Sequence, residues 1–345
     1  KILLTAEYYI KNTDDVLVGV NVPSTSGTSN PIIRNAASIQ NKGFEFEALY
    51  RNRTSGSGFN WTIGANLATF SSLVTELPNP IIGPSVTEDL TRVNRFIEGE
   101  APGVYWGFET AGVYADQNAI ESDANIANDV VRKDLVQPGD FIRVDQNNDG
   151  IVNNDDQIIL GDPTPDFTYG INFTGSYKAL DFGLFFNGVQ GNEIFNMSKF
   201  FHTVWADGNK LATMNNAWSP SNTNTNMPRA TAMDAGGNRA PSDFFVEDGS
   251  YLRLRTLEVG YTIGQNTIAN WLGDLRIFVT GQNLLTLTGY SGYDPDVSST
   301  NGGRATIDGG FPGNRPNLNP LLGRGIDVRA YPNTRTIMFG IQAQF

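Results

Sequence analysis

The 345 residues of this chain could form one large β domain or two ordinary domains, and the composition narrows the choice. Apolar residues make up 39% and charged residues 17%, and no run approaches the roughly 20 apolar residues of a membrane-spanning helix, which excludes a helical membrane protein. The net charge of -12 would repel phosphate backbones and argues against nucleic-acid binding. The chain has no cysteine, so sheet closure or metal ions must replace disulfides outside the cytoplasm.

The chain begins with a strand-like pattern and has neither a starting Met nor a signal peptide, so we expect it to start partway through a longer protein. Period-2 alternation then recurs in about eight segments of roughly ten residues, with one apolar and one polar face. The apolar faces are Leu4/Ala6/Tyr8/Ile10, Phe44/Phe46/Ala48/Tyr50, Phe59/Trp61/Ile63/Ala65/Leu67, Phe167/Tyr169/Ile171/Phe173/Tyr177, the run 180–188, Leu257/Val259/Tyr261/Ile263, Leu275/Ile277/Val279 and Ile337/Phe339/Ile341/Ala343/Phe345.

The connections between these segments favour a membrane barrel over a soluble sandwich. Short turns at 54–57, 178–179 and about 264–273 alternate with long connections, which is typical of outer-membrane barrels with turns in the periplasm and loops outside. Counting strands across the membrane predicts one large extracellular loop region at 71–165 and a C-terminus at Phe345 in the periplasm. The apolar faces would contact outer-membrane lipid, and Asn60, Thr62, Asn66 and Asn172 would face the lumen.

Two arginines conflict with this pattern. Arg253 and Arg255 share the parity of the apolar residues Leu257 and Val259, and a lipid-facing Arg costs about 2–4 kcal/mol at the middle of the bilayer. We therefore expect both to lie near the outer rim, or a β-bulge that turns them inward.

The segment 145–156 matches the spacing of an EF-hand calcium loop. The predicted Ca²⁺ ligands are Asp145, Asn147, Asp149, the backbone carbonyl of Ile151, Asn153 and Asp156, with Gly150 at the tight turn. Asp156 stands where EF-hands carry Glu, and its shorter side chain would weaken the site. The flanking residues are predicted to be short strands instead of helices, so the metal would stiffen an external loop. A plain turn rich in Asn and Asp is the alternative.

Other loop residues carry weaker signals. His202 has no Ser, Cys or metal-ligand partner at useful spacing, so we expect a packed loop residue. Aromatic loop residues such as Tyr105, Tyr114 and Tyr290 could stack on sugar rings or on a partner's surface, but such residues more often pack a core within the loops or form the interfacial girdle. No catalytic constellation stands out, so an enzyme is not expected.

Nearly the whole chain, in family order, is similar to SusC/RagA-type TonB-dependent transporters, the barrel subunits that import nutrients in Bacteroidetes. The resembling stretches include the strand opening Asn41-Lys42-Gly43-Phe44-Glu45, Tyr105-Trp106-Gly107-Phe108, the 145–156 loop, and Gly281-Gln282-Asn283-Leu284-Leu285 with Tyr293-Asp294-Pro295-Asp296. The resemblance implies about eight C-terminal strands of a larger, 22-stranded transmembrane antiparallel β-barrel with long extracellular loops. The family's plug domain has no counterpart in residues 1–345.

The resemblance also implies a function and its partners. The barrel would import an oligosaccharide or a peptide across the outer membrane, beneath a SusD-like surface lipoprotein. TonB–ExbB–ExbD would supply energy through the missing N-terminal part. Two alternatives stay open: an independent eight-stranded barrel, and a secreted calcium-dependent glycan-binding or adhesive β protein.

Overall fold

A computed structural model describes most of the chain, and the described part is mainly β-structure. The described residues are 1–20, 25, 32–53, 58–82, 93–129, 132–204, 208–264, 273–297, 324–328 and 330–344. The predicted turn at 54–57, most of the one at 264–273, and Phe345 lie outside them.

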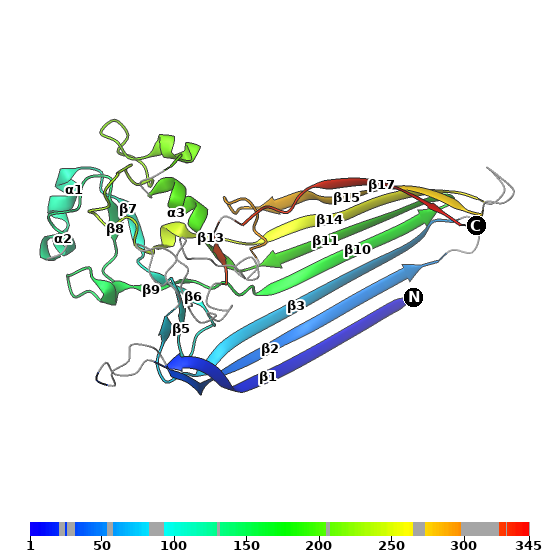
Figure 1. Ribbon diagram of the computed structural model, residues 1–345, viewed down its shortest axis with the longest axis horizontal. Helices are drawn as coiled ribbons and strands as arrows, with labels where there is room; N and C mark the ends of the chain where they lie inside the picture. The colour runs from blue at the N-terminus through cyan, green and yellow to red at the C-terminus, as the bar shows by residue number, and fades with distance from the viewer. Residues whose placement is uncertain are drawn as a thin grey trace.

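Eight strands form one antiparallel sheet, which we call the wall (Figure 1). All eight predicted segments are strands of this sheet, so the prediction from alternation is confirmed. In sheet order they are β1 (Ile2–Val20), β2 (Ile32–Asn52), β3 (Asn60–Glu76), β10 (Phe167–Tyr177), β11 (Leu180–Gln190), β14 (Tyr251–Ile263), β15 (Leu275–Thr288) and β17 (Thr336–Ala343).

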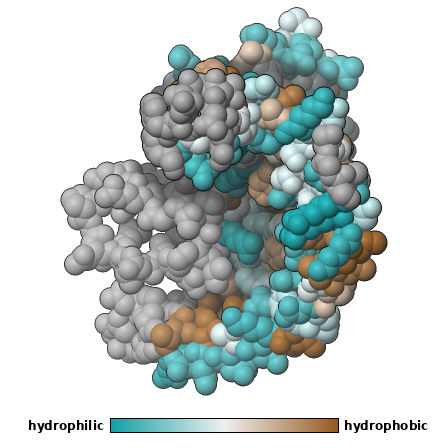
Figure 2. Space-filling view, turned by 90° about the vertical axis from the view of Figure 1, so that its right-hand side faces the viewer, coloured by the Kyte–Doolittle hydropathy of each residue, from teal (hydrophilic) through white to brown (hydrophobic). Residues whose placement is uncertain are grey.

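The wall is curved and has one apolar face. Pairing carries the alternation across neighbouring strands: Ala48 lies opposite Ala65, and Ala65 opposite Ile171. The apolar face is exposed, with Tyr8 at 64% and Ile341 at 72% of full accessibility, as expected of a surface whose solvent is lipid. Figure 2 looks along the strands and shows the wall around a hollow, with hydrophobic side chains along its rim.

Aromatic rings line the turn end of the apolar face. Tyr50 and Trp61 lie 5.1 Å apart between ring centroids, Trp61 and Phe173 6.1 Å, and Phe173 and Phe182 5.7 Å, so the contacts run across four strands. Membrane barrels place such rings at the bilayer boundary, where an apolar body meets a polar edge.

The wall is open. Among the strands that the structure describes, β1 and β17 are the two ends of the sheet order and do not pair with each other. The alternative of an independent eight-stranded barrel, which needs that pairing, is therefore not what this structure shows.

The two ends of the wall differ. Lys178 and Ala179 alone join β10 to β11, with Lys178 at φ 52°, which confirms this predicted two-residue turn. Both chain termini lie at this turn end (Figure 1). β1 and β2 extend furthest at the other end. They are 19 and 21 residues long, about twice the length of strand that is required to cross a bilayer. β3 likewise continues to Glu76, past residue 71 where the loop was predicted to begin.

The described parts of three long connections, within 77–166, 191–250 and 289–335, fold together beyond the long-strand end, and we call them the loop head (Figure 1). Its elements are β4 (Ile81–Ile82), β5 (Asn94–Phe96), β6 (Val104–Gly107), β7 (Thr110–Val113), α1 (Gln117–Ser122), α2 (Ala124–Asn128), β8 (Phe141–Arg143), η2 (Asn154–Asp156), β9 (Ile158–Gly161), β12 (Glu193–Asn196), α3 (Met197–Thr203), η3 (Ala212–Asn216), η4 (Asp243–Phe245), β13 (Val246–Asp248) and β16 (Ile326–Asp327).

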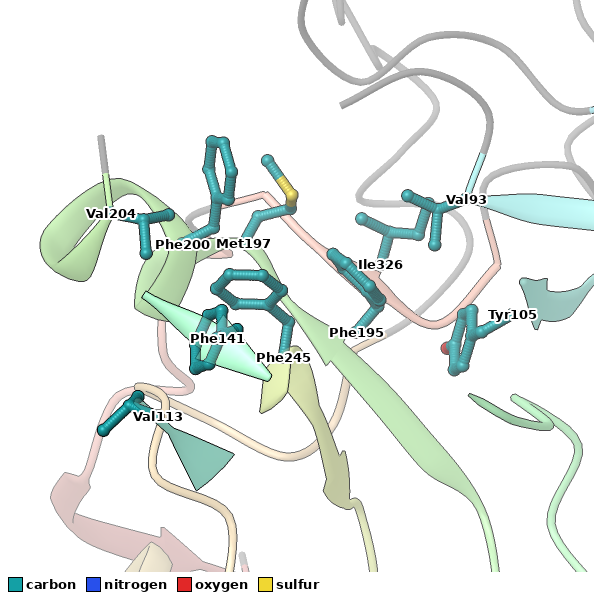
Figure 3. Close-up of a cluster of buried hydrophobic side chains, with 10 residues drawn as sticks. All are labelled: Val93, Tyr105, Val113, Phe141, Phe195, Met197, Phe200, Val204, Phe245 and Ile326. Carbon is teal, nitrogen blue, oxygen red and sulfur yellow. The ribbon is translucent and has the colours of Figure 1, made fainter. Parts of the chain in front are cut away.

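The loop head has its own hydrophobic core, which draws residues from all three connections (Figure 3). The buried cluster comprises Val93, Tyr105, Val113, Phe141, Phe195, Met197, Phe200, Val204, Phe245 and Ile326. A smaller cluster, centred on Val74 and Phe96, packs where β1, β2 and β3 extend past the wall. The described parts of the three long connections thus form one folded unit.

No helix within the described residues has the length and apolar character required to cross a membrane.

Candidate functional site

The inner face of the wall is polar, as the alternation predicted. Asn66 and Asn172 line a depression of about 570 Å³ on this face, whereas Asn60 and Thr62 lie nearer the turn end and do not line it. Gly170 keeps the depression open beside Asn66, because a Cβ at Gly170 would lie 2.4 Å from the Asn66 Oδ1.

Three carboxylates add negative charge to the inner face at the depression. Glu7 on β1 lies directly opposite Glu45 on β2, and Glu47 follows on the same face. Like charges directly opposite each other destabilise a sheet. No ion pair within the described part of the chain involves them. The depression therefore carries a negative potential. The alternation in the sequence placed the three glutamates on the polar face. That Glu7 lies opposite Glu45 could be known only from the register of β1 against β2.

A second group on the inner face pairs one arginine with two carboxylates. The Arg276 Nε donates to the Asp181 Oδ2 over 3.0 Å, and the Arg276 Nη2 lies 2.7 Å from the Glu258 Oε1. The Thr280 hydroxyl completes the group by donating to the other Glu258 oxygen over 2.8 Å. The group joins β11, β14 and β15 side by side, so it braces the wall near its turn end. Sequence reasoning missed it.

The conflict over Arg253 and Arg255 is resolved by a bulge. Pairing shifts between Leu254 and Thr256, so Arg255 is the extra residue against β11 and Arg253 turns to the inner face. Arg253 is 1% exposed, and its Nε donates to the Thr286 hydroxyl over 3.0 Å. The bulge alternative of the prediction is confirmed for Arg253, whereas Arg255 is the bulged residue itself and lies 3.8 Å from Asp296.

Arg253 also fastens the base of the β15–β17 connection. Its guanidinium forms an ion pair with Asp294 and lies 3.5 Å from Asp296. Asp294 accepts the Asn333 backbone N–H over 2.9 Å. Burial would raise the pKa of Asp294, but hydrogen bonds from the backbone of Asp296 and Asn333 and from Arg253 outweigh it and hold that pKa below its usual value.

A buried charged hub joins two of the head's connections. Asp140 accepts from the Arg229 Nε over 2.6 Å, from the Asn238 amide over 2.9 Å and from the Gln137 backbone over 2.8 Å. The side chain of Asp140 is fully buried, and Arg229 is 17% exposed. This arrangement satisfies a carboxylate that would otherwise be costly to bury.

Two further arginines donate hydrogen bonds to the backbone at Gly236 and Gly237, next to Asn238. The Arg132 Nη2 donates to the Gly236 carbonyl over 3.2 Å, and the Arg143 Nη2 donates to the Gly237 carbonyl over 2.5 Å. Burial lowers the pKa of Arg132; burial and then the nearby Arg132 charge lower that of Arg143 to about 9. The Arg143 guanidinium still carries its charge at neutral pH.

The predicted calcium loop lies between β8 and β9, the two short strands that the sequence predicted around it. Asp145, Asn147 and Asp149 accept backbone N–H groups of the loop, including Gly150 to the Asp145 Oδ2 over 2.8 Å. Asn153 caps the start of η2, and Asp156 is fully buried, with its two oxygens accepting the N–H groups of Gln146 and Asn153. Gly150 has φ 83°, as the tight turn requires.

The loop's fit to a cation is partial. The Asp145 Oδ1 is buried and has no hydrogen-bond partner, so one carboxylate oxygen is free to bind a cation. Over the described ranges, no three acidic or His side chains converge as a metal cluster. Amide and carbonyl oxygens, including that of Ile151, would have to supply the remaining ligands.

The loop aromatics mostly pack inside the head. Tyr105, Tyr114 and Tyr290 are at most 6% exposed, and their hydroxyls donate to the Glu193 carbonyl, the Asp123 carboxylate and the Asp327 carboxylate. His202 belongs to α3, and its Nδ1 lies 3.0 Å from the Asn209 carbonyl. These residues build the head.

Comparison with known proteins covers the whole chain. No family model matches it. TonB-dependent receptor P3 of Formosa agariphila is 34% identical over 347 residues, which cover 99% of this chain and 32% of that protein. TonB-dependent receptor SusC of Bacteroides thetaiotaomicron is 22% identical, over 98% of this chain and 29% of SusC. The chain thus spans about a third of the length of these relatives.

The fold agrees with these sequence matches. A solved structure of the RagAB peptide transporter matches with a TM-score of 0.72 at 20% identity, over 100% of this chain and 33% of that one. The relatives' names describe receptors and a transporter, which is consistent with the prediction that the chain is not an enzyme. Since the matches run along the entire wall and loop head, the chain belongs to the SusC/RagA-type TonB-dependent receptors and forms part of their outer-membrane β-barrel.

Proposed function

We propose that this chain supplies part of the barrel wall and the outer loop head of an energy-coupled nutrient importer. The observation that carries the proposal is a wall with an exposed apolar face outside and a polar, depressed face inside, matched along its whole length by TonB-dependent receptors. In this reading the loop head, including residues 71–165, stands outside the cell, and the two-residue turn at Lys178 lies in the periplasm.

The partners follow from the same proposal. A SusD-like surface lipoprotein covers the loop head and traps the ligand above the wall. TonB–ExbB–ExbD delivers energy through a plug domain outside residues 1–345. The ligand is an oligosaccharide or a peptide, and the carboxylates Glu7, Glu45 and Glu47 disfavour an anionic one.

The test uses the whole gene product in its own membrane. We expect extraction only with detergent and a folded band that migrates differently after boiling. We also expect loss of uptake of a labelled oligosaccharide or peptide mixture when TonB is deleted. A soluble monomer obtained without detergent would reject the proposal.

The secreted glycan-binding alternative makes a different prediction. It requires calcium-dependent affinity for glycans by a soluble protein. The continuous apolar outer face argues against it, because soluble proteins rarely expose apolar patches larger than a few hundred Å².

We further propose that Ca²⁺ binds the 145–156 loop through Asp145, Asn147, Asp149, the Ile151 carbonyl, Asn153 and Asp156. The unpaired, buried Asp145 Oδ1 and the positive φ of Gly150 support the site. The ion would fix β8 against β9 in a head that has no disulfide.

A further inference from the structure

Three neighbouring stretches of chain cross between the wall and the loop head, and we call them the junction (Figure 1). They are residues 161–167, 190–193 and 248–251. Backbone hydrogen bonds tie them together: the Glu193 N–H donates to the Asp162 carbonyl over 2.9 Å, and the Gly249 N–H donates to the Asn192 carbonyl over 2.8 Å. Movement of the head relative to the wall at these crossings must therefore strain or break these bonds.

Each crossing carries a carboxylate at this point. The Glu193 Oε2 accepts the Asp162 backbone N–H over 2.8 Å, so the side chain of one crossing is fixed to the backbone of the next. The Asp162 Oδ1 accepts the Thr164 N–H over 2.7 Å. Asp248 lies opposite Glu193 in the β12–β13 pair, which places both side chains on the same face of that sheet. The junction thus brings like charges together.

The groups around Asp162 and Glu193 are mainly negative. The charged or titratable ones are Asp166, Asp248, Tyr105 on β6 and Arg324. No ion pair within the described part of the chain involves any of the four carboxylates. Burial raises the pKa of Asp162 and of Glu193, and the Asp166 charge raises both further, despite the hydrogen bonds that the two carboxylates accept.

We propose that the junction is an acid-tightened hinge: protonation of Asp162 and Glu193 fastens the loop head to the wall, and their ionisation loosens it. The closed junction binds these protons more tightly than an opened one, in which both carboxyl groups reach water. The closed form is therefore favoured as the pH falls through the raised values, whereas above them the partly buried charges oppose it. The inference goes beyond the proposed importer, and only the exposure of the hinge to the external medium rests on that proposal.

Hydrogen exchange of the Gly249 backbone amide measures opening of the junction, because its N–H bonds to the neighbouring crossing. Glu193→Gln removes a charge and keeps an oxygen that can accept the Asp162 N–H. It leaves the sequence around Gly249 unchanged, so the rate of the unaltered protein divided by that of the variant at one pH cancels the intrinsic chemistry of exchange. In the whole gene product in detergent, with a chelator present, we expect this ratio to be several-fold at about pH 7.5 and to approach unity at about pH 4.5.

A second variant tests the same hinge from the other crossing. Asp162→Asn also keeps an acceptor for the Thr164 N–H and should slow exchange at Gly249 at neutral pH. Glu121→Gln is the control: it removes an exposed carboxylate on α1, at the far end of the head, and should leave the rate unchanged (Figure 1). The boil-sensitive band reports that each variant is folded.

Exchange at Gly249 that is as fast in both junction variants as in the unaltered protein at neutral pH, or faster, would overturn the hinge. The measurement needs no transport, so it stands or falls separately from the importer proposal.

Discussion

The wall and the loop head place their apolar side chains in opposite ways. In the wall, Ile171 and its neighbours point outward and the polar side chains face a hollow. In the head, Phe195, Phe200 and Phe245 are fully buried, and charged groups such as Asp140 are buried only with partners. Lipid surrounds the wall and water surrounds the head. Apolar side chains therefore point outward in the wall and inward in the head, and the change occurs within a few residues of each strand end.

The largest expected effect breaks the head alone. Asp140→Ala leaves Arg229 and the Asn238 amide without their carboxylate, and removing one partner of a buried pair costs about 3–5 kcal/mol. Limited proteolysis should then cut the head readily while the boil-sensitive band of the barrel persists. Asp134→Ala, on the exposed surface of the same segment, is the control and should behave as the unaltered protein. Loss of both regions together would contradict their independence.

The next effect breaks the wall alone. Ile171→Arg points a charge into lipid and should cost about 2–4 kcal/mol, which lowers the amount of assembled barrel in the membrane. Asn172→Arg, one residue along the same strand, points into the polar depression and should assemble normally. The ratio of folded band between the two variants measures the difference. Equal assembly would mean that β10 does not face lipid.

A smaller effect tests calcium in the head. At ten to a hundred times its dissociation constant, a bound ion stabilises by about 1–3 kcal/mol. Asp145→Ala with Asp149→Ala removes two hydrogen bonds from backbone N–H groups of the loop under all conditions, and should therefore lower the melting temperature of the head by more in Ca²⁺ than in chelator. Asp155→Ala, which removes an exposed carboxylate at a non-ligand position of the loop, serves as the control. Identical melting of the unaltered protein with and without Ca²⁺ would refute the site.

The smallest expected effect is on how stability depends on pH in the acid range. The pKa of Asp294 is below its usual value in the folded protein, so its contribution to stability is fully present above about pH 4 and is lost as the pH falls through the lowered value. Asp294→Asn should flatten this part of the stability profile, measured by denaturant unfolding between about pH 3 and 6. A profile unchanged by the substitution would show that the hydrogen bonds from Asp296, Asn333 and Arg253 to this carboxylate contribute nothing there.

Alternation predicted the wall because each strand obeys a local rule. Whether Phe173 or Thr174 meets lipid depends only on the parity of the position, and every predicted segment became a strand. The bulge near Arg255 could also be predicted, because a lipid-facing arginine is costly. The lengths of β1 and β2 could not, because their outer ends are supported by contacts with Val74 and Phe96, far along the chain.

The fold of the head could not be predicted either, because it also depends on contacts between residues that are far apart in the sequence. The Asn94 amide and the Arg324 carbonyl are 230 positions apart, and the Asp140 hub joins residues 89 and 98 apart. No period in the sequence encodes such contacts, which depend on three connections folding together. The calcium-type loop was visible because its ligand pattern is local, and it still awaits a test with the ion.

The bulge at Arg255 makes the length of β14 tolerant of change at one position. Loss of one residue from a strand normally turns every side chain beyond it to the opposite face. Here the extra residue itself can be deleted: Leu254 would then precede Thr256 in regular alternation against β11, with Leu254 still opposite Phe186 and Arg253 still opposite Asn187. A one-codon deletion, among the most disruptive changes elsewhere in the barrel, would at this codon keep the faces of β14 against β11 and confine the adjustment to Asn283 and Leu284 of β15, which lie opposite Arg255.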